Sequence, residues 1–124
     1  MLNPKNFIRC EATFGNAWKS TFNELEVCVI GDEISPSQTA IALVQQLGLH
    51  MEAARTKALQ LLKLLVRLDD QWSFDGIEIG PESLTDKTVD LQLSHVDDLY
   101  GLWVVTFSLN SGSPEPVAFR REQI

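Results

Sequence analysis

The sequence predicts an α+β fold, a two-layer sandwich in which two helices cover one face of an antiparallel sheet of about five to six strands. Two observations support this fold. β-Branched and aromatic residues concentrate in segments at both ends of the chain, and between them lie two stretches whose apolar residues recur at helical spacing. The predicted order is β-β-α-α-β-β-β. The 124 residues contain no repeat, linker or low-complexity tract, so we expect one domain over residues 1–124.

The first part of the chain has the composition of strands. Residues 7–14 and 18–30 are rich in β-branched and aromatic side chains, and Gly15 and Asn16 supply a turn between them. Towards residue 30, apolar and polar side chains alternate, which is typical of a strand with one buried face. The expected core face carries Leu25, Val27 and Val29, and the other face carries Glu24, Glu26 and Cys28.

The first helix is predicted to begin at Ser35 and to end at Leu47. Ser35 is a good N-cap residue, Pro36 suits the first helical position, and Gln38 completes a capping box. Gly48 is expected to end the helix in a left-handed conformation.

The second helix is predicted over residues 50–68 and is apolar on more than one side. One stripe of apolar residues recurs every three or four positions, as in a helix packed on a sheet. Leu59, Leu64 and Val66 fall outside this stripe. Because spare apolar surface often marks an interface, the sequence predicts, as one alternative, a homodimer formed through residues 50–68.

Residues 71–87 are predicted to be irregular, with one helical turn at residues 81–84, because Gly76, Gly80 and Pro81 interrupt the pattern. Three strands are then expected at residues 88–96, 102–109 and 117–121. Turn-forming residues separate them, so they should form a meander in which the last strand lies at an edge.

Composition and charge exclude several classes of protein. The hydrophobic fraction is 44%, acids outnumber bases 17 to 10, and the net charge of −7 argues against a nucleic-acid-binding protein. No apolar run approaches the length of a membrane span, and residues 1–30 show no signal-peptide pattern. We therefore expect a cytoplasmic protein that binds neither nucleic acid nor a membrane.

No motif points to catalysis. His50, His95, Cys10 and Cys28 are the chain's histidines and cysteines, and their spacing matches no metal-ligand pattern. The two cysteines are expected to be small apolar residues on strands. A phosphate-binding loop and a nucleophile elbow are both missing from the sequence. The prediction is a protein without catalytic activity, metal or cofactor.

The acidic residues are unevenly distributed. Residues 69–98 contain nine carboxylates and a single base, Lys87, and this segment therefore carries the whole excess of negative charge. Such a concentration is either a solvated surface or a site for a basic partner. Trp72 lies within it and is expected either to anchor an interface or to fold back, with Phe74, over the end of the helix. The predicted partner-binding residues are Asp69, Asp70, Trp72, Asp75, Glu82, Asp86, Asp97 and Asp98.

The last third of the chain resembles small bacterial immunity proteins of polymorphic and contact-dependent toxin systems. The resemblance lies in a strand from residue 88, an acidic turn with Tyr100, the strand 102–107, and a turn containing Pro114 and Glu115. The Trp and His that flank this turn in those relatives are replaced here by Ser113 and Pro116.

The resemblance implies a protein that neutralises a cognate toxin, and it transfers no catalytic residue. A toxin that acts on nucleic acid needs an electropositive active site, so an acidic inhibitor would match a nuclease. Two alternatives remain open at this point. One is self-association through the long helix, and the other is a small-molecule-binding or catalytic pocket between sheet and helices.

Overall fold

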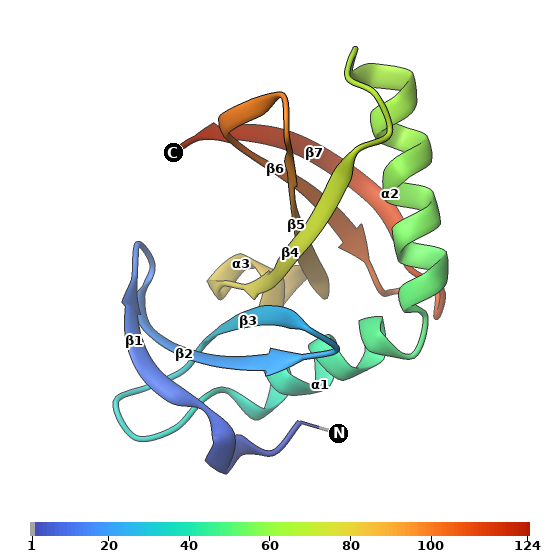
Figure 1. Ribbon diagram of the computed structural model, residues 1–124. Coiled ribbons are helices and arrows are strands. Elements are labelled where there is room, and N and C mark those ends of the chain that lie inside the picture. The colour runs from blue at the N-terminus through green and yellow to red at the C-terminus, as the bar shows by residue number, and fades with distance from the viewer. Residues whose placement is uncertain (1) are drawn as a thin grey trace.

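The computed structural model describes residues 2–124, and these residues build one seven-stranded sheet with three α-helices (Figure 1). The strands lie side by side in chain order, from β1 to β7. They are β1 (Ile8–Ala12), β2 (Gly15–Phe22), β3 (Leu25–Ile30), β4 (Trp72–Ile79), β5 (Thr88–His95), β6 (Asp98–Ser108) and β7 (Glu115–Gln123). The helices are α1 (Gln38–Gly48), α2 (Met51–Leu65) and α3 (Pro81–Asp86), and a short 3₁₀ turn spans Pro4–Asn6.

The α+β class is confirmed, but the prediction of a purely antiparallel sheet is wrong. β3 and β4 run parallel, with Val27 opposite Ile77 and Val29 opposite Ile79, and the other neighbouring pairs are antiparallel. The reason is the connection between them. Both α1 and α2 lie between β3 and β4 in the chain, and this helical crossover returns the chain to the end of the sheet from which β3 started.

Residues 18–30, predicted as one strand, form parts of two. Asn23 and Glu24 separate β2 from β3, and both have left-handed backbone angles, with φ of 51° and 69°. Two consecutive left-handed residues make a tight hairpin turn that matches the twist of the strands. The extra strand was missed because Glu24 is an uncommon residue in such a turn.

The prediction of an irregular segment at residues 71–87 is also wrong, although its helical turn is confirmed and extends to Asp86 as α3. Residues 72–79 form β4, a central strand. Gly76, expected to break the structure, lies within this strand. A Cβ atom there would come within 2.8 Å of the Glu26 carbonyl oxygen and 2.9 Å of Gln92 Oε1, so glycine permits close strand packing.

The two long helices are confirmed with different ends. Ser37, and not Ser35, caps α1, because its Oγ accepts a hydrogen bond from the Ala40 N–H at 3.1 Å. Gly48 belongs to α1 and is not left-handed. Its lack of a side chain leaves room for the ring of Phe22. α2 ends at Leu65, three residues earlier than predicted.

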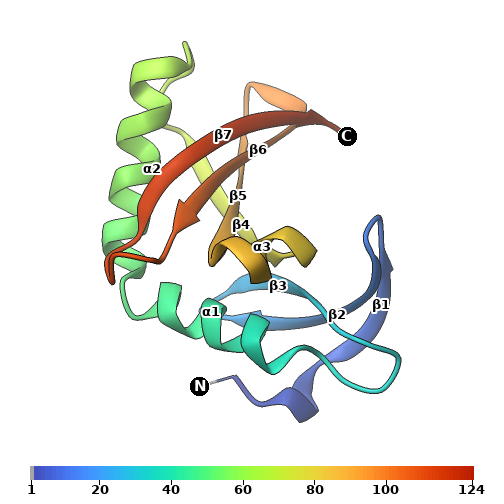
Figure 2. The ribbon, with the colours of Figure 1, turned by 180° about the vertical axis from the view of Figure 1, so that it is seen from behind.

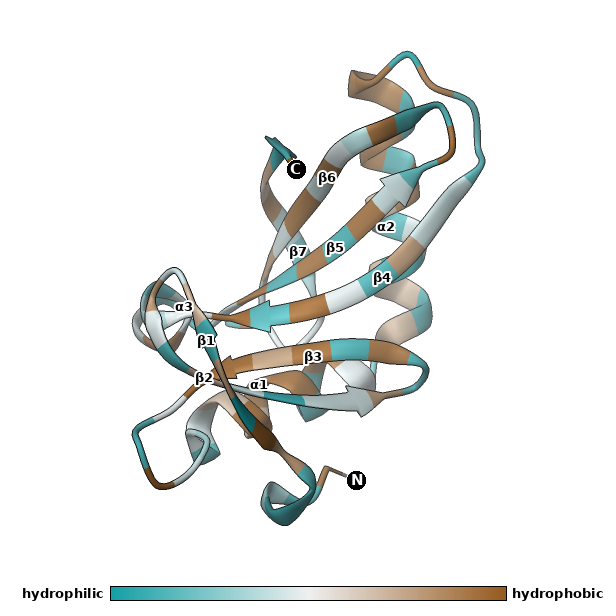
Figure 3. Cartoon of the chain, turned by 60° about the vertical axis from the view of Figure 1, so that its left-hand side comes forward, coloured by the Kyte–Doolittle hydropathy of each residue, from teal (hydrophilic) through white to brown (hydrophobic). Residues whose placement is uncertain are grey.

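The C-terminal meander of β5, β6 and β7 is confirmed, with β7 at the edge of the sheet. α1 and α2 lie on the same face of the sheet, as seen from behind in Figure 2 and from the side in Figure 3. This face supplies the core, which includes Val27, Ile77, Leu91 and Phe107. α3 lies at one end of β4 and β5 and contacts α1.

Within residues 2–124, no long helix covers the opposite face of the sheet, and this face is largely polar. In one row across the strands, Cys28 lies opposite Glu78, Glu78 opposite Asp90, and Asp90 opposite Thr106. We call this surface the open face. Among residues 2–124, no helix combines the length and apolar character that crossing a membrane requires.

Candidate functional site

The structure divides the predicted partner-binding residues among separate places. Glu82 and Asp86 are exposed on α3 and line a cavity. Asp75 is exposed on β4 and shares a shallow hollow with Glu24, Glu26 and Lys19. The remaining five lie near the far end of the sheet, around the connections that enter β4 and β6. They are Asp69, Asp70, Trp72, Asp97 and Asp98.

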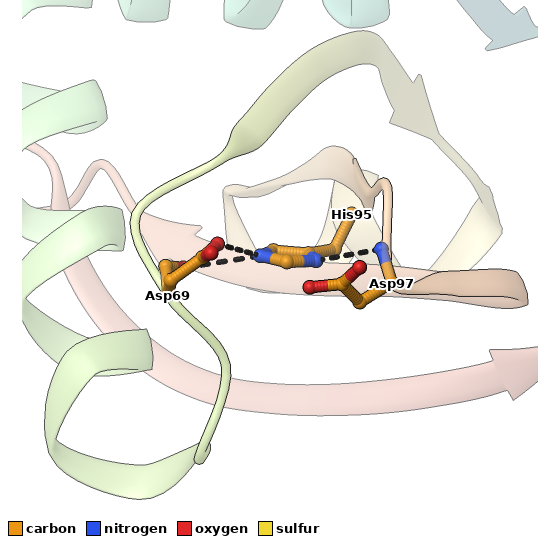
Figure 4. A group of neighbouring side chains, drawn as sticks. All are labelled: Asp69, His95 and Asp97. Atoms are coloured by element: carbon orange, nitrogen blue, oxygen red, sulfur yellow. Dashed lines mark hydrogen bonds and ion pairs between the residues drawn. The ribbon is translucent and has the colours of Figure 1, made fainter.

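His95 organises that far end. Its side chain is buried, with 3% of the residue exposed, and its Nε2 lies 2.8 Å from Asp69 Oδ1 (Figure 4). Its Nδ1 accepts a hydrogen bond from the Asp97 N–H at 3.0 Å. The proton therefore sits on Nε2, which donates to Asp69. The side chain of Asp97 completes a group whose ligand atoms lie within 4.8 Å of one another, as in a metal site. Since both ring nitrogens are already bonded, the group fits a structural clamp better than a metal site.

Trp72 packs against this clamp. Its ring meets the rings of His95 and Trp103 edge-on, with centroids 4.8 and 5.7 Å apart. Trp72 and Phe74 are both half-buried against the core, and Arg55 of α2 lies over the Phe74 ring at 5.3 Å. The protein itself therefore partly covers Trp72.

Asp98 is bonded within the chain. Arg121 donates from Nε and Nη2 to its two carboxylate oxygens, each at 2.8 Å, and Trp103 Nε1 donates at 2.8 Å. These bonds, that of Arg121 first, lower the pKa of Asp98 to about 2. Gly101 lies beneath the pair, and a Cβ atom there would collide with the Asp98 carboxylate. The Asp98 carboxylate is thus already bonded within the chain.

One cavity lies at the open face, where β4, β5, β6 and β7 meet α3 and the β1–β2 turn. Its volume is about 600 Å³. Five carboxylates and a single guanidinium group line it. The charged lining residues are Glu78, Glu82, Asp86, Asp90, Glu122 and Arg120.

Part of this charge is balanced inside the cavity. Arg120 donates to Glu122 at 2.7 Å and to Asp90 at 3.3 Å. The Thr106 hydroxyl donates to the other oxygen of Asp90 at 2.6 Å. Burial opposes ionisation of Arg120, but its bonds to the two carboxylates outweigh burial and raise its pKa. Asp90 and Glu122 are therefore compensated.

The surroundings of Glu78 in the cavity disfavour its negative charge. Its side chain is half-buried and accepts one hydrogen bond, from Gln92 to Oε2 at 3.0 Å. Burial, followed by repulsion from Asp90 and Glu122, raises the pKa of Glu78 above its usual value. A perturbed carboxyl group inside a cavity is typical of a functional site.

Sequence reasoning included Glu78 and Asp90 in the acidic segment but did not select them, and it missed Arg120 and Glu122. One signal was present, because Glu78 lies between Ile77 and Ile79 as a strand residue pointing away from the core would. The approach of Arg120 to Asp90 joins residues 30 positions apart. This contact depends on the pairing of three strands, which a local pattern does not reveal.

The apolar residues outside the predicted stripe of the second helix differ in exposure. Leu64 of α2 is 83% exposed and Leu59 is 37% exposed, whereas Val66 packs against the core.

The Cys28 thiol lies on β3 and is half-buried. Burial raises the pKa of this thiol to about 12, so it stays protonated at neutral pH.

Comparisons with family models, with curated proteins and with solved structures find no significant match to this chain. The cavity and the distribution of charge are therefore the features of this chain that bear on its function.

Proposed function

We propose that this protein is a non-catalytic binding protein whose open face receives a basic surface of a partner protein. The observation that carries the proposal is the cavity of about 600 Å³ lined by five carboxylates and one arginine. Glu82 and Asp86 are exposed at its margin and form no ion pair among residues 2–124. Uncompensated carboxylates around a concave surface attract cations and accelerate association with a basic partner.

The resemblance to immunity proteins makes a toxin domain the specific partner in this proposal. A nuclease would present a basic active site, because its substrate is a polyanion. The acidic cavity would then match the charge of that active site and block it. In this proposal the contact residues lie around the cavity, and not at Asp98, whose carboxylate Arg121 already holds.

The test uses the C-terminal domain of a large secreted protein encoded directly upstream of this chain. That domain, expressed from an inducible promoter, should stop growth, and co-expression of this chain should restore it. Failure of the full chain to bind the domain or to restore growth, or the lack of such a gene, would contradict the toxin proposal.

A charge-reversed pair of variants tests the surface. Glu82→Lys with Asp86→Lys should lower the association rate by about tenfold or more and weaken its salt dependence. Glu33→Lys with Glu52→Lys makes the same change of charge at exposed positions outside the cavity. This control should leave the rate within about twofold. Equal losses for both pairs would show that net charge, and not the cavity, controls binding.

A second candidate function is self-association through α2. The exposed leucines Leu64 and Leu65 favour it, since 83% and 54% of these residues are accessible. Light scattering during size-exclusion chromatography decides between the two. A monomer that becomes a heterodimer with its partner supports the first proposal, and a homodimer that Leu64→Lys dissociates supports the second.

A further inference from the structure

We propose that the cavity recognises one particular group, the guanidinium of an arginine side chain presented by the partner. The inference rests on the proposed function and adds the chemistry of the ligand. It starts from the carboxylate oxygens that the chain leaves unpaired. Asp90 uses both of its oxygens, for Thr106 and Arg120. Within residues 2–124, the carboxylates of Glu82 and Asp86 accept no hydrogen bond, and Glu78 uses only Oε2.

A buried polar group also faces the cavity without a partner. Ser83 of α3 lines the cavity and is only 7% exposed. Its hydroxyl forms no hydrogen bond within residues 2–124 and keeps some contact with open space. The hydroxyl is therefore a free acceptor at the cavity wall for a ligand that donates a hydrogen bond.

An aromatic wall completes the site. Phe14, from the β1–β2 turn, lines the cavity and lies close enough to Gly80 that an added Cβ would be 3.6 Å from its ring. A guanidinium stacks on an aromatic face more readily than an ammonium does, and its planar fork donates to carboxylates in pairs. The combination of Phe14, Ser83 and free carboxylates thus favours arginine over lysine.

Size and charge agree with this occupant. The cavity of about 600 Å³ lies in the range of small-ligand sites and exceeds the volume of one side chain. Neighbouring residues of the partner would fill the remaining volume. The resident Arg120 stays paired with Asp90 and Glu122, so the incoming cation meets the carboxylates that Arg120 does not neutralise.

The experiment is a titration of the ¹⁵N-labelled full chain, followed by amide chemical shifts. The probes are three capped pentapeptides, Gly-Gly-X-Gly-Gly, in which X is arginine, lysine or citrulline. Citrulline has the shape of arginine without its charge. We expect the arginine peptide to shift the amides of Phe14, of residues 80–86 and of residues 117–122. The lysine peptide should bind several-fold more weakly, and the citrulline peptide should cause no saturable shift.

Variants test the assignment to these residues. Glu78→Gln and Ser83→Ala should each weaken binding of the arginine peptide, Glu78→Gln by about tenfold, as for one charge-assisted hydrogen bond. The matched control, Glu33→Gln, should bind like the wild type. Circular dichroism and the dispersion of the amide spectrum establish that each variant is folded before its affinity is interpreted.

Three results would overturn the inference. The first is equal shifts with arginine and citrulline peptides. The second is a saturable response spread over all acidic surfaces and unaffected by Glu78→Gln. The third is tighter binding of free spermidine than of the arginine peptide, which would make a polyamine the ligand. Any of these can occur while a partner protein still binds the open face, so failure of this inference is distinguishable from failure of the proposed function.

Discussion

The parallel pairing of β3 with β4 depends on Gly76, and Gly76→Ala tests it. The new methyl group would lie 2.8 Å from the Glu26 carbonyl oxygen and 2.9 Å from Gln92 Oε1, whereas ordinary contacts begin near 3.4 Å. The Glu26 oxygen belongs to the neighbouring strand and cannot move without shifting β3. Gln92 can rotate away, but it then loses its hydrogen bond to Glu78.

The expected cost follows from these two contacts. Overpacking a rigid site destabilises a protein by about 1–3 kcal/mol, and losing the Gln92 hydrogen bond adds about 1 kcal/mol. Replacing glycine returns about 0.5–1 kcal/mol because the unfolded chain becomes less flexible. The net loss in unfolding free energy is therefore about 1–3.5 kcal/mol, a large part of a typical domain's stability.

Urea denaturation followed by tryptophan fluorescence measures this loss. With a slope of about 1.5 kcal/mol per molar urea, the midpoint should fall by about 0.7–2.3 M. Gly80→Ala is the control, because its Cβ would meet only the Phe14 ring at an ordinary 3.6 Å. A midpoint for Gly76→Ala that equals that of Gly80→Ala would refute the close parallel packing.

Three further predictions concern the titratable groups. His95→Leu should lower the unfolding free energy by about 2 kcal/mol, because both ring nitrogens lose their hydrogen bonds. Asp69→Asn should cost less than about 1 kcal/mol, because the amide oxygen still accepts from His95 Nε2. Zinc should not raise the melting temperature of the wild type. The pKa of Asp98 is lowered from 3.8 to about 2, so its stabilising effect is complete above pH 4 and disappears as the pH falls towards 2. Asp98→Asn should flatten the stability profile in that window. The pKa of Glu78 is raised above 4.5, so its ionisation opposes folding as the pH rises, and Glu78→Gln should be more stable than the wild type at pH 7 but not at pH 3. Equal stabilisation at both pH values would show that packing, and not charge, explains the Glu78 effect.

The strands that sequence patterns predicted best are those with uninterrupted alternation. Val89, Leu91 and Leu93 occupy every second position of β5 and are fully buried, as expected. β4 was not predicted because a bulge at Asp75 interrupts the strand. Phe74 faces the core before the bulge and Ile77 faces it afterwards, so the period of two is broken in the middle of the strand.

The sequence predicted the acidic character of the candidate site but not which of its carboxylates the fold neutralises. A concentration of carboxylates after residue 68 was visible, and Glu82 and Asp86 do line the cavity. The internal use of Asp98 was not visible, because its partner Arg121 comes from a different strand 23 positions away. Charge counted along the chain cannot separate carboxylates that are free to bind a partner from those that the fold neutralises.

Hydrogen–deuterium exchange on the complex with the basic partner domain tests the proposed interface most directly. We expect slower exchange at the β1–β2 turn around Phe14, in α3, and in the β7 segment around Arg120, with unchanged exchange in α2. Protection confined to α2, with the cavity segments exchanging as in the free protein, would contradict it.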